Sequence, residues 1–160
     1  MQYARTIGKQ LKIFLLSVSY ILHYVYPGDY GSYIDLDHDW EYCVPCAEGH
    51  LTGKPQWQWR DSPIAKHKRD DNIAEDNLTD FVNNGIRDPT SIELAKHKVL
   101  TNGHHRFYAA LDLEWKYIPV LLLNTEGIVD FNQSGISNRF VQPWNGLPYT
   151  ESSQIKALAY

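Results

Sequence analysis

The hexapeptide TNGHHR, which ends at Arg106, holds the residues of this sequence best suited to bind an anion. Asn102 and Gly103 allow a tight turn, and the apolar spacing that follows predicts that a helix begins there. The first amides of a helix have no partner within the helix, so such an end attracts anions. Arg106 adds a bidentate donor, while His104 and His105 can change protonation near neutral pH. The hexapeptide therefore predicts a phosphate cradle of the kind that nucleotides use.

The same residues have a plainer interpretation. The Asn-Gly pair can be merely a turn, and the two histidines can cap the helix or pack on its surface. Both interpretations stay open on local chemistry alone, because short motifs often match by chance.

Apolar spacing predicts the elements that would position this turn. Leu78, Phe81 and Val82 follow the helical period, and Asp76 or Asn77 precedes them as a cap. The other expectations nearby are a left-handed helix end at Gly85, a hairpin or bent strand formed by residues 91–95 and 98–100, a helix containing Phe107, Ala110 and Leu111, and a buried strand over residues 117–123.

The rest of the chain gives weaker signals. The apolar stretch 11–26 predicts a buried helix or a strand pair. The alternative is a targeting or membrane segment, which the polar interruptions and the short length disfavour. Trp57 and Trp59 alternate as in a short strand, and the densely charged stretch 66–76 indicates a solvated loop. The residues after 124 indicate an irregular extension that ends in a weak helix.

Three segments together resemble the ParB/sulfiredoxin-like domain family: GIRDP at 85–89, TNGHHRFYAALDL at 101–113 and YIPVLLL at 117–123. The resemblance covers roughly residues 57–123. It implies an α+β fold with a small mixed sheet and flanking helices, preceded by an N-terminal extension (1–56) and followed by a C-terminal extension (124–160). It also implies binding of a nucleotide, ATP, ADP or CTP, together with Mg²⁺.

The turn distinguishes the branches of that family. Sulfiredoxins carry Gly-Cys-His-Arg, so His104 stands at the place of the redox cysteine, while His105 and Arg106 match the phosphate-binding pair. Chromosome-partitioning ParB proteins carry Gly-Glu-Arg-Arg, which binds CTP, and a helix-turn-helix that has no clear counterpart here. The Asp-Gly-His-His-Arg turn of free serine kinases and ParB-like nucleases is more similar. Asn102 replaces its Asp, a change that bears on catalysis more than on binding.

An enzyme of this kind needs a carboxylate near the phosphates, to accept a proton or to hold Mg²⁺. The resemblance implies that Glu75, in the loop before a helix, has this role, and His104 is a second candidate for proton transfer. Asp76 is better explained as a helix cap. Arg60 is expected to face the nucleotide or, alternatively, to form a surface salt bridge.

A second group of residues could bind a metal. His38, Cys43, Cys46 and His50 have the spacing H-x4-C-x2-C-x3-H, and two thiolates with two imidazoles suit tetrahedral Zn²⁺. The surrounding stretch is rich in turns and poor in core residues, so a structural zinc could order it. The alternatives are a redox pair or two buried thiols.

Composition limits the remaining choices. The 160 residues, 43% of them hydrophobic, suffice for one domain with a real core, and two cysteines are too few for a secreted disulfide scaffold, which favours a cytoplasmic protein. A net charge of −4 gives no general attraction to nucleic acid or an anionic membrane. Three functions fit: an enzyme of phosphoryl transfer or of phosphodiester hydrolysis, a non-catalytic nucleotide switch, and a protein-interaction module of phage or plasmid type.

Overall fold

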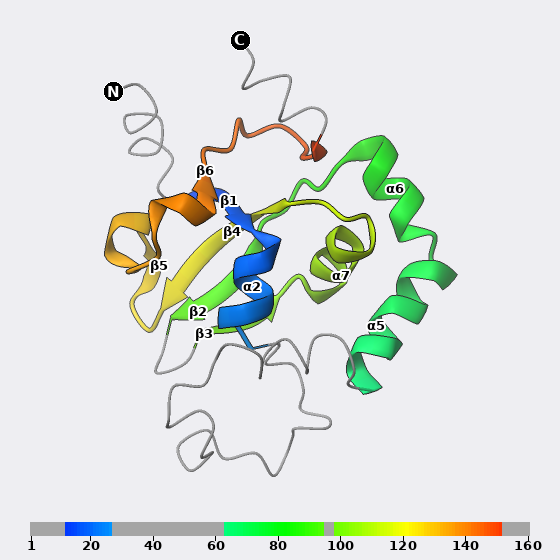
Figure 1. Cartoon of the computed structure of the whole chain (residues 1–160), viewed down its shortest axis with the longest axis horizontal. Helices are drawn as coiled ribbons and strands as arrows, with labels where there is room; N and C mark the ends of the chain where they lie inside the picture. Colours follow the sequence, from blue (N-terminus) through cyan, green and yellow to red (C-terminus); the bar gives the residue numbers. More distant parts are fainter. Residues whose placement is uncertain (1–11, 27–62, 95–97, 152–160) are drawn as a thin grey trace.

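The computed structural model describes residues 12–26, 63–94 and 98–151, which form a mixed sheet with helices beside it (Figure 1). Within these residues the sheet has six strands in the order β3-β2-β4-β1-β6, and β5 pairs with β4. The strands are β1 (Ile13–Ser17), β2 (Thr90–Leu94), β3 (Lys98–Asn102), β4 (Tyr117–Asn124), β5 (Gly127–Val129) and β6 (Val141–Gln142). The α-helices are α2 (Val18–Tyr24), α5 (Pro63–Ala74), α6 (Asn77–Asn84) and α7 (His104–Asp112). This architecture is compatible with the α+β class expected from the sequence.

Strand β4 lies at the centre of the sheet, parallel to β2 and antiparallel to β1. Its residues Ile118, Val120 and Leu122 are fully buried. A nearly continuous apolar run is typical of a strand that is covered on both faces. The expectation of a buried strand over 117–123 is confirmed.

The apolar stretch near the N-terminus forms one strand followed at once by one helix, rather than a single helix or a strand pair. Ser17 ends β1 and caps α2, because its Oγ accepts a hydrogen bond of 3.2 Å from the amide of Tyr20. Strand β1 pairs with β4 on one side and with β6 on the other. The sheet therefore extends beyond residues 57–123 on both ends of the sequence.

Residues 66–76 were expected to form a solvated loop, and this expectation is wrong, because most of them belong to α5. Ala65 and Asn72 are fully buried on one side of the helix, while Lys66 and Asp70 form a 2.6 Å ion pair one turn apart on its exposed side. Pairs at this spacing support a helix. The dense charge is thus the solvated face of a helix that packs against α7.

Helix α6 forms where apolar spacing predicted it. Gly85 ends it with a φ of +78°, but its ψ of 170° differs from the left-handed helical conformation that was expected. Asp76 is the N-cap residue, as expected, and adopts a left-handed conformation, but its side chain makes no capping hydrogen bond. Asn77 is the first helical residue. Its side-chain Nδ2 donates hydrogen bonds to Oδ1 of Asn72 and to Oε2 of Glu75. The start of α6 is therefore fixed by contacts with α5.

The residues around the TNGHHR turn form the expected elements. Strands β2 and β3 pair as an antiparallel hairpin, whose tip lies outside the described residues. Helix α7 follows β3 directly and buries Phe107, Tyr108, Ala109 and Ala110. In Figure 1, α5 and α6 lie beyond α7, on the side away from the sheet. The N-terminus of α7 thus lies between the end of β3 and these two helices.

The C-terminal part returns to the same region. Tyr149 exchanges two backbone hydrogen bonds with Ile86, at 2.8 and 2.9 Å. Pro148 lies so close to Gly85 that a Cβ built there would be 2.9 Å from its atoms. These contacts fix the loop that leads from α6 to β2.

The expected strand at Trp57 and Trp59 lies outside the described residues. The expected C-terminal helix also lies outside them, apart from Glu151. Among the described helices, none combines the length and the apolar character needed to cross a membrane.

We expect Gly85→Ala to destabilise the protein more than Gly146→Ala does. Both glycines have a φ near +80°, but a Cβ at Gly146 would meet nothing within 4 Å. The contact with Pro148 adds to the backbone strain that a side chain meets at Gly85, where φ is +78° and ψ is 170°, and overpacking of this kind costs about 1–3 kcal/mol. Urea unfolding of the two variants measures it, and equal losses of stability would contradict the close contact.

Candidate functional site

The turn before α7 is built on the close approach of Gly103 to strand β2. Gly103 has a φ of +101°, and a Cβ placed on it would lie 2.6 Å from Thr90 Oγ1 and 2.6 Å from Arg106 Nη1. Only glycine fits this conformation and this space. The carbonyl of Gly103 accepts the first helical hydrogen bond, from the amide of Phe107 at 3.0 Å. The sequence thus folds into a strand, a glycine turn and the start of a helix.

The N-cap residue of α7 is Gly103. A glycine has no side chain that could cap the first amides of the helix. Amides at a helix start have no intrahelical acceptor, and the helix dipole adds positive potential. This end of α7 therefore favours an anion.

Thr90 provides a second polar feature under the same turn. The residue is fully buried, and among the described residues its Oγ1 has no hydrogen-bond partner. Buried hydroxyls almost always have a partner, so an orphan calls for an explanation such as a ligand or an ordered water. Its position against Gly103 directs that explanation to the N-terminus of α7.

Arg106 lies beside this helix end and next to a cavity. Its Nη1 donates to the carbonyl of Pro89 at 3.1 Å, which uses one of its five N–H donors. The cavity has a volume of about 510 Å³ and is lined by Asp80, Phe81, Asn84, Gly85, Arg87, Asp88 and Arg106. Two guanidinium groups and two carboxylates thus surround a space large enough for a small ligand.

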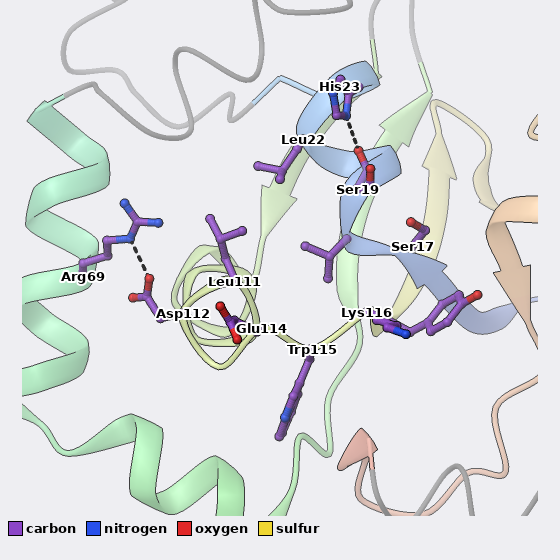
Figure 2. A pocket seen from close by; sticks show the side chains of 12 residues that line it. Ser17, Ser19, Leu22, His23, Arg69, Leu111, Asp112, Glu114, Trp115 and Lys116 are labelled. Atoms are coloured by element: carbon purple, nitrogen blue, oxygen red, sulfur yellow. Dashed lines mark hydrogen bonds and ion pairs between the residues drawn. The ribbon is translucent and has the colours of Figure 1, made fainter.

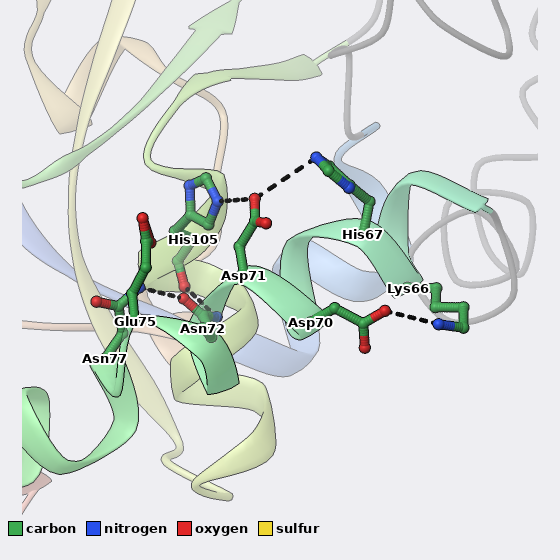
Figure 3. Close-up of polar contacts among 8 residues, drawn as sticks. All are labelled: Lys66, His67, Asp70, Asp71, Asn72, Glu75, Asn77 and His105. Atoms are coloured by element: carbon green, nitrogen blue, oxygen red, sulfur yellow. Dashed lines mark hydrogen bonds and ion pairs between the residues drawn. The ribbon is translucent and has the colours of Figure 1, made fainter.

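His105 points from α7 toward α5, where Asp71 holds it (Figure 3). The Nε2 of His105 donates to Oδ2 of Asp71 at 3.1 Å, and the Nε2 of His67 lies 3.6 Å from the same oxygen. The hydrogen bond from His105 is the main cause that lowers the pKa of Asp71, and the charge of His67 lowers it further. Asp71 is therefore ionised near neutral pH, and its carboxylate orients the imidazole ring of His105.

Asn72 joins the three helices around the site. It is fully buried, and its Nδ2 donates to the carbonyl of His105 at 3.1 Å. Its Oδ1 accepts from Asn77 at 2.9 Å, and Asn77 also donates to Glu75 at 3.3 Å (Figure 3). One buried amide thus holds the first turn of α7 against the junction of α5 and α6.

The structure brings several of the predicted site residues together at the start of α7. Asn102 ends β3 and is exposed, while His104 is the first residue of α7 and is only 8% exposed. Glu75 is exposed in the linker between α5 and α6 and reaches the site through Asn77. The other predicted site residues lie outside the described residues: Arg60, His38, Cys43, Cys46 and His50.

Four residues of the site were not found from the sequence. Asp71 and Asn72 were hidden in the charge run, although His67 and Asp71 have the same i,i+4 spacing as Lys66 and Asp70. This repeated i,i+4 spacing indicates a helix, and it could have identified this stretch as helical from the sequence. Thr90 and Arg87 carry no local signal, because only the fold brings them to the turn.

The described residues contain no group of three or more His, Cys, Asp or Glu side chains arranged to hold a metal ion. The Cys/His cluster that predicted zinc is not among these residues. Mg²⁺ commonly binds through substrate phosphates and one or two carboxylates, so a nucleotide would bring most of its ligands. Glu75 is the carboxylate that the sequence proposed for this purpose.

A second cavity, of about 740 Å³, lies at the opposite end of α7, between α2, α5 and the turn before β4 (Figure 2). Leu22 and Leu111 form part of its wall, and the Nε of Arg69 lies 3.1 Å from Asp112 Oδ1. The C-terminal end of a helix carries negative potential, which disfavours an anion there. The phosphate-binding candidate is therefore the N-terminal end of α7.

Comparisons with known proteins gave no match, either to a family model, to a curated protein or to a solved structure. The resemblance to the ParB/sulfiredoxin-like family rests on the three sequence segments alone and stays a prediction.

We expect the titration of Asp71 to depend on His105. Since the hydrogen bond from His105 lowers the pKa of the carboxyl group, its midpoint should lie below 3.8 in the wild type and rise in His105→Ala. His67→Ala should raise it less, because the charge of His67 is a smaller cause. NMR titration of the Asp71 carboxyl carbon measures all three midpoints. An unchanged midpoint in His105→Ala would contradict the pairing.

Proposed function

We propose that this protein binds the phosphate groups of a nucleotide at the N-terminus of α7. The observation that carries the proposal is the buried hydroxyl of Thr90, which has no hydrogen-bond partner among the described residues and lies against Gly103, the N-cap residue of α7. Arg106 adds a charged donor at the same place. An anion with several oxygen atoms, such as a phosphate, can use all three features at once.

The cavity beside Arg106 supports a nucleotide rather than phosphate alone. Arg87 and Arg106 can share the charge of two phosphates, and the carboxylates of Asp80 and Asp88 can accept hydrogen bonds from ribose hydroxyls. Phe81 is partly buried and offers an aromatic surface for a base. Its volume of about 510 Å³ falls in the range of small-ligand sites.

The reaction we propose is phosphoryl transfer or phosphodiester hydrolysis, with His105 as the group that moves the proton. Its side chain is 39% exposed, whereas His104 is buried, so His105 is the histidine that a ligand can reach. Asp71 orients the ring as the carboxylate does in other acid–base pairs. Glu75 stays a candidate for holding Mg²⁺ or for accepting a proton from a hydroxyl group.

The ParB/sulfiredoxin-like family is part of the proposal. The order of hairpin, glycine turn, helix and buried strand over residues 90–124 is compatible with the expected domain. Within that family, the Gly-His-His-Arg turn favours the branch of stand-alone kinases and ParB-like nucleases.

We expect ATP, ADP or CTP, with or without Mg²⁺, to bind the wild type and to bind Arg106→Ala at least tenfold more weakly. A hydrogen bond to a charged group contributes about 1.5–3 kcal/mol, and 1.4 kcal/mol is a factor of ten. Arg139→Ala is the matched control, because Arg139 is exposed on a short helix outside the site. Calorimetric titration of the three proteins measures the affinities.

Two results would contradict the proposal: no nucleotide binds the wild type, or Arg139→Ala weakens binding as much as Arg106→Ala does. Nucleotide binding without turnover would instead identify a switch, which keeps the site and removes the catalytic part. A product that disappears in His105→Ala would support the enzyme.

A further inference from the structure

We propose that the cavity at the C-terminal end of α7 binds a free amino acid with a large apolar side chain. This cavity shares no lining residue with the one beside Arg106, which lies toward the other end of the same helix. The proposal therefore goes beyond the proposed function and does not depend on it.

The observation that carries the proposal is an incomplete ion pair on the wall of this cavity (Figure 2). The Nε of Arg69 lies 3.1 Å from Oδ1 of Asp112, but this buried N–H has no hydrogen-bond partner among the described residues. Within the same residues, Nη1 and Nη2 of Arg69 and Oδ2 of Asp112 make no hydrogen bond either. Arginine and a carboxylate often form two parallel hydrogen bonds. This pair instead keeps donors and an acceptor for another molecule.

The surroundings hold the pair in place and shield it in part from water. The side chains of Arg69 and Asp112 are only 27% and 32% exposed. The guanidinium also lies over the ring of Tyr108, 5.4 Å from its centroid. Polar groups that are shielded from water without a partner cost free energy. A ligand is therefore favoured if it brings an anionic group to Arg69 and a cationic group to Asp112.

An α-amino acid carries both groups on one carbon atom. Its carboxylate can accept hydrogen bonds from Nη1 and Nη2 of Arg69, while its ammonium donates to Oδ2 of Asp112. Two neighbouring charges on the protein thus match two neighbouring charges on the ligand.

The charge of the cavity as a whole agrees with a zwitterion. Lys116 and Glu114 also line it and add one charge of each sign to those of Arg69 and Asp112. The negative potential at the C-terminal end of α7 opposes a lone anion. A zwitterion brings no net charge, so this potential orients it, with the ammonium toward the helix end, and does not repel it.

The apolar part of the wall indicates the kind of amino acid. Leu22 of α2 and Leu111 of α7 extend toward the space beside Arg69 (Figure 2), and Val18 and Trp115 complete the apolar lining. The volume of about 740 Å³ falls in the range of small-ligand sites. Burial of apolar surface stabilises a complex in proportion to its area. A side chain such as that of leucine or phenylalanine is therefore favoured over that of glycine.

The test is calorimetric titration of the full chain with L-phenylalanine, L-leucine and glycine. We expect the two apolar amino acids to bind saturably and glycine to bind at least about tenfold more weakly. N-acetyl-L-phenylalanine lacks the ammonium, and 2-phenylethylamine lacks the carboxylate. Each should bind at least about tenfold more weakly than L-phenylalanine, because each leaves one charge of the protein pair unmatched.

Two variants locate the site. Asp112→Asn removes the partner of the ammonium and should weaken binding of L-phenylalanine at least about tenfold. Ser19→Phe places an aromatic ring at the cavity from an exposed position of α2, and it should reduce binding without touching the core. Asp70→Asn is the matched control, because it also breaks an ion pair of α5, that with Lys66, but on the exposed side of the helix. Thermal melting of each variant identifies any loss of folding.

The proposal is overturned if neither apolar amino acid binds, or if one of the two analogues binds as tightly as L-phenylalanine. It is also overturned if a folded Asp112→Asn keeps the wild-type affinity, because the ion pair then only holds α5 against α7. Equal losses in Asp70→Asn and Asp112→Asn have the same meaning. Titration with ATP separates the two proposals, since Asp112→Asn should leave nucleotide binding unchanged and Arg106→Ala should leave amino-acid binding unchanged.

Discussion

The contact between Gly103 and Thr90 is the constraint on which the rest of the site depends. A side chain at position 103 would occupy the space of Thr90 Oγ1 and Arg106 Nη1, so the turn exists only with glycine. Because β3 runs into α7 through this residue, the backbone of the turn lies against Thr90 of β2, and the N-cap residue of the helix has no side chain. The missing side chain at position 103 also leaves the space that Arg106 Nη1 occupies.

Two groups of contacts keep this helix end in place. On one side, Asn72 and Asp71 of α5 hold the carbonyl and the ring of His105. On the other side, the backbone pairing of Tyr149 with Ile86 fixes the loop whose last carbonyl, that of Pro89, accepts from Arg106. Elements far apart in the sequence therefore determine one site. The strand from residues 13–17 belongs to the same sheet, where it lies between β4 and β6.

The sequence predicted the parts of this arrangement that depend on local spacing. The glycine turn, α6, α7 and β4 follow from apolar period and from Gly85 and Gly103, and the structure contains them. The stretch 66–76 was mistaken for a loop because its charges hide the buried position Asn72, and Ala65, a buried position about two helical turns earlier, lies just before the stretch. Thr90 and Asp71 could not be assigned, since their roles arise from contacts with residues 13 and 34 positions away. Long-range pairing is not encoded in any short window.

The most direct test of a phosphate site at this helix start is an amide NMR titration of the ¹⁵N-labelled chain with ATP. We expect the amide signals of His104, His105 and Arg106 to move the most and to saturate together, because these N–H groups would bind the phosphate oxygens. The amides of Glu114 to Lys116, at the opposite end of α7, should stay in place. Saturable shifts at that opposite end, with the first turn of α7 unaffected, would contradict the account.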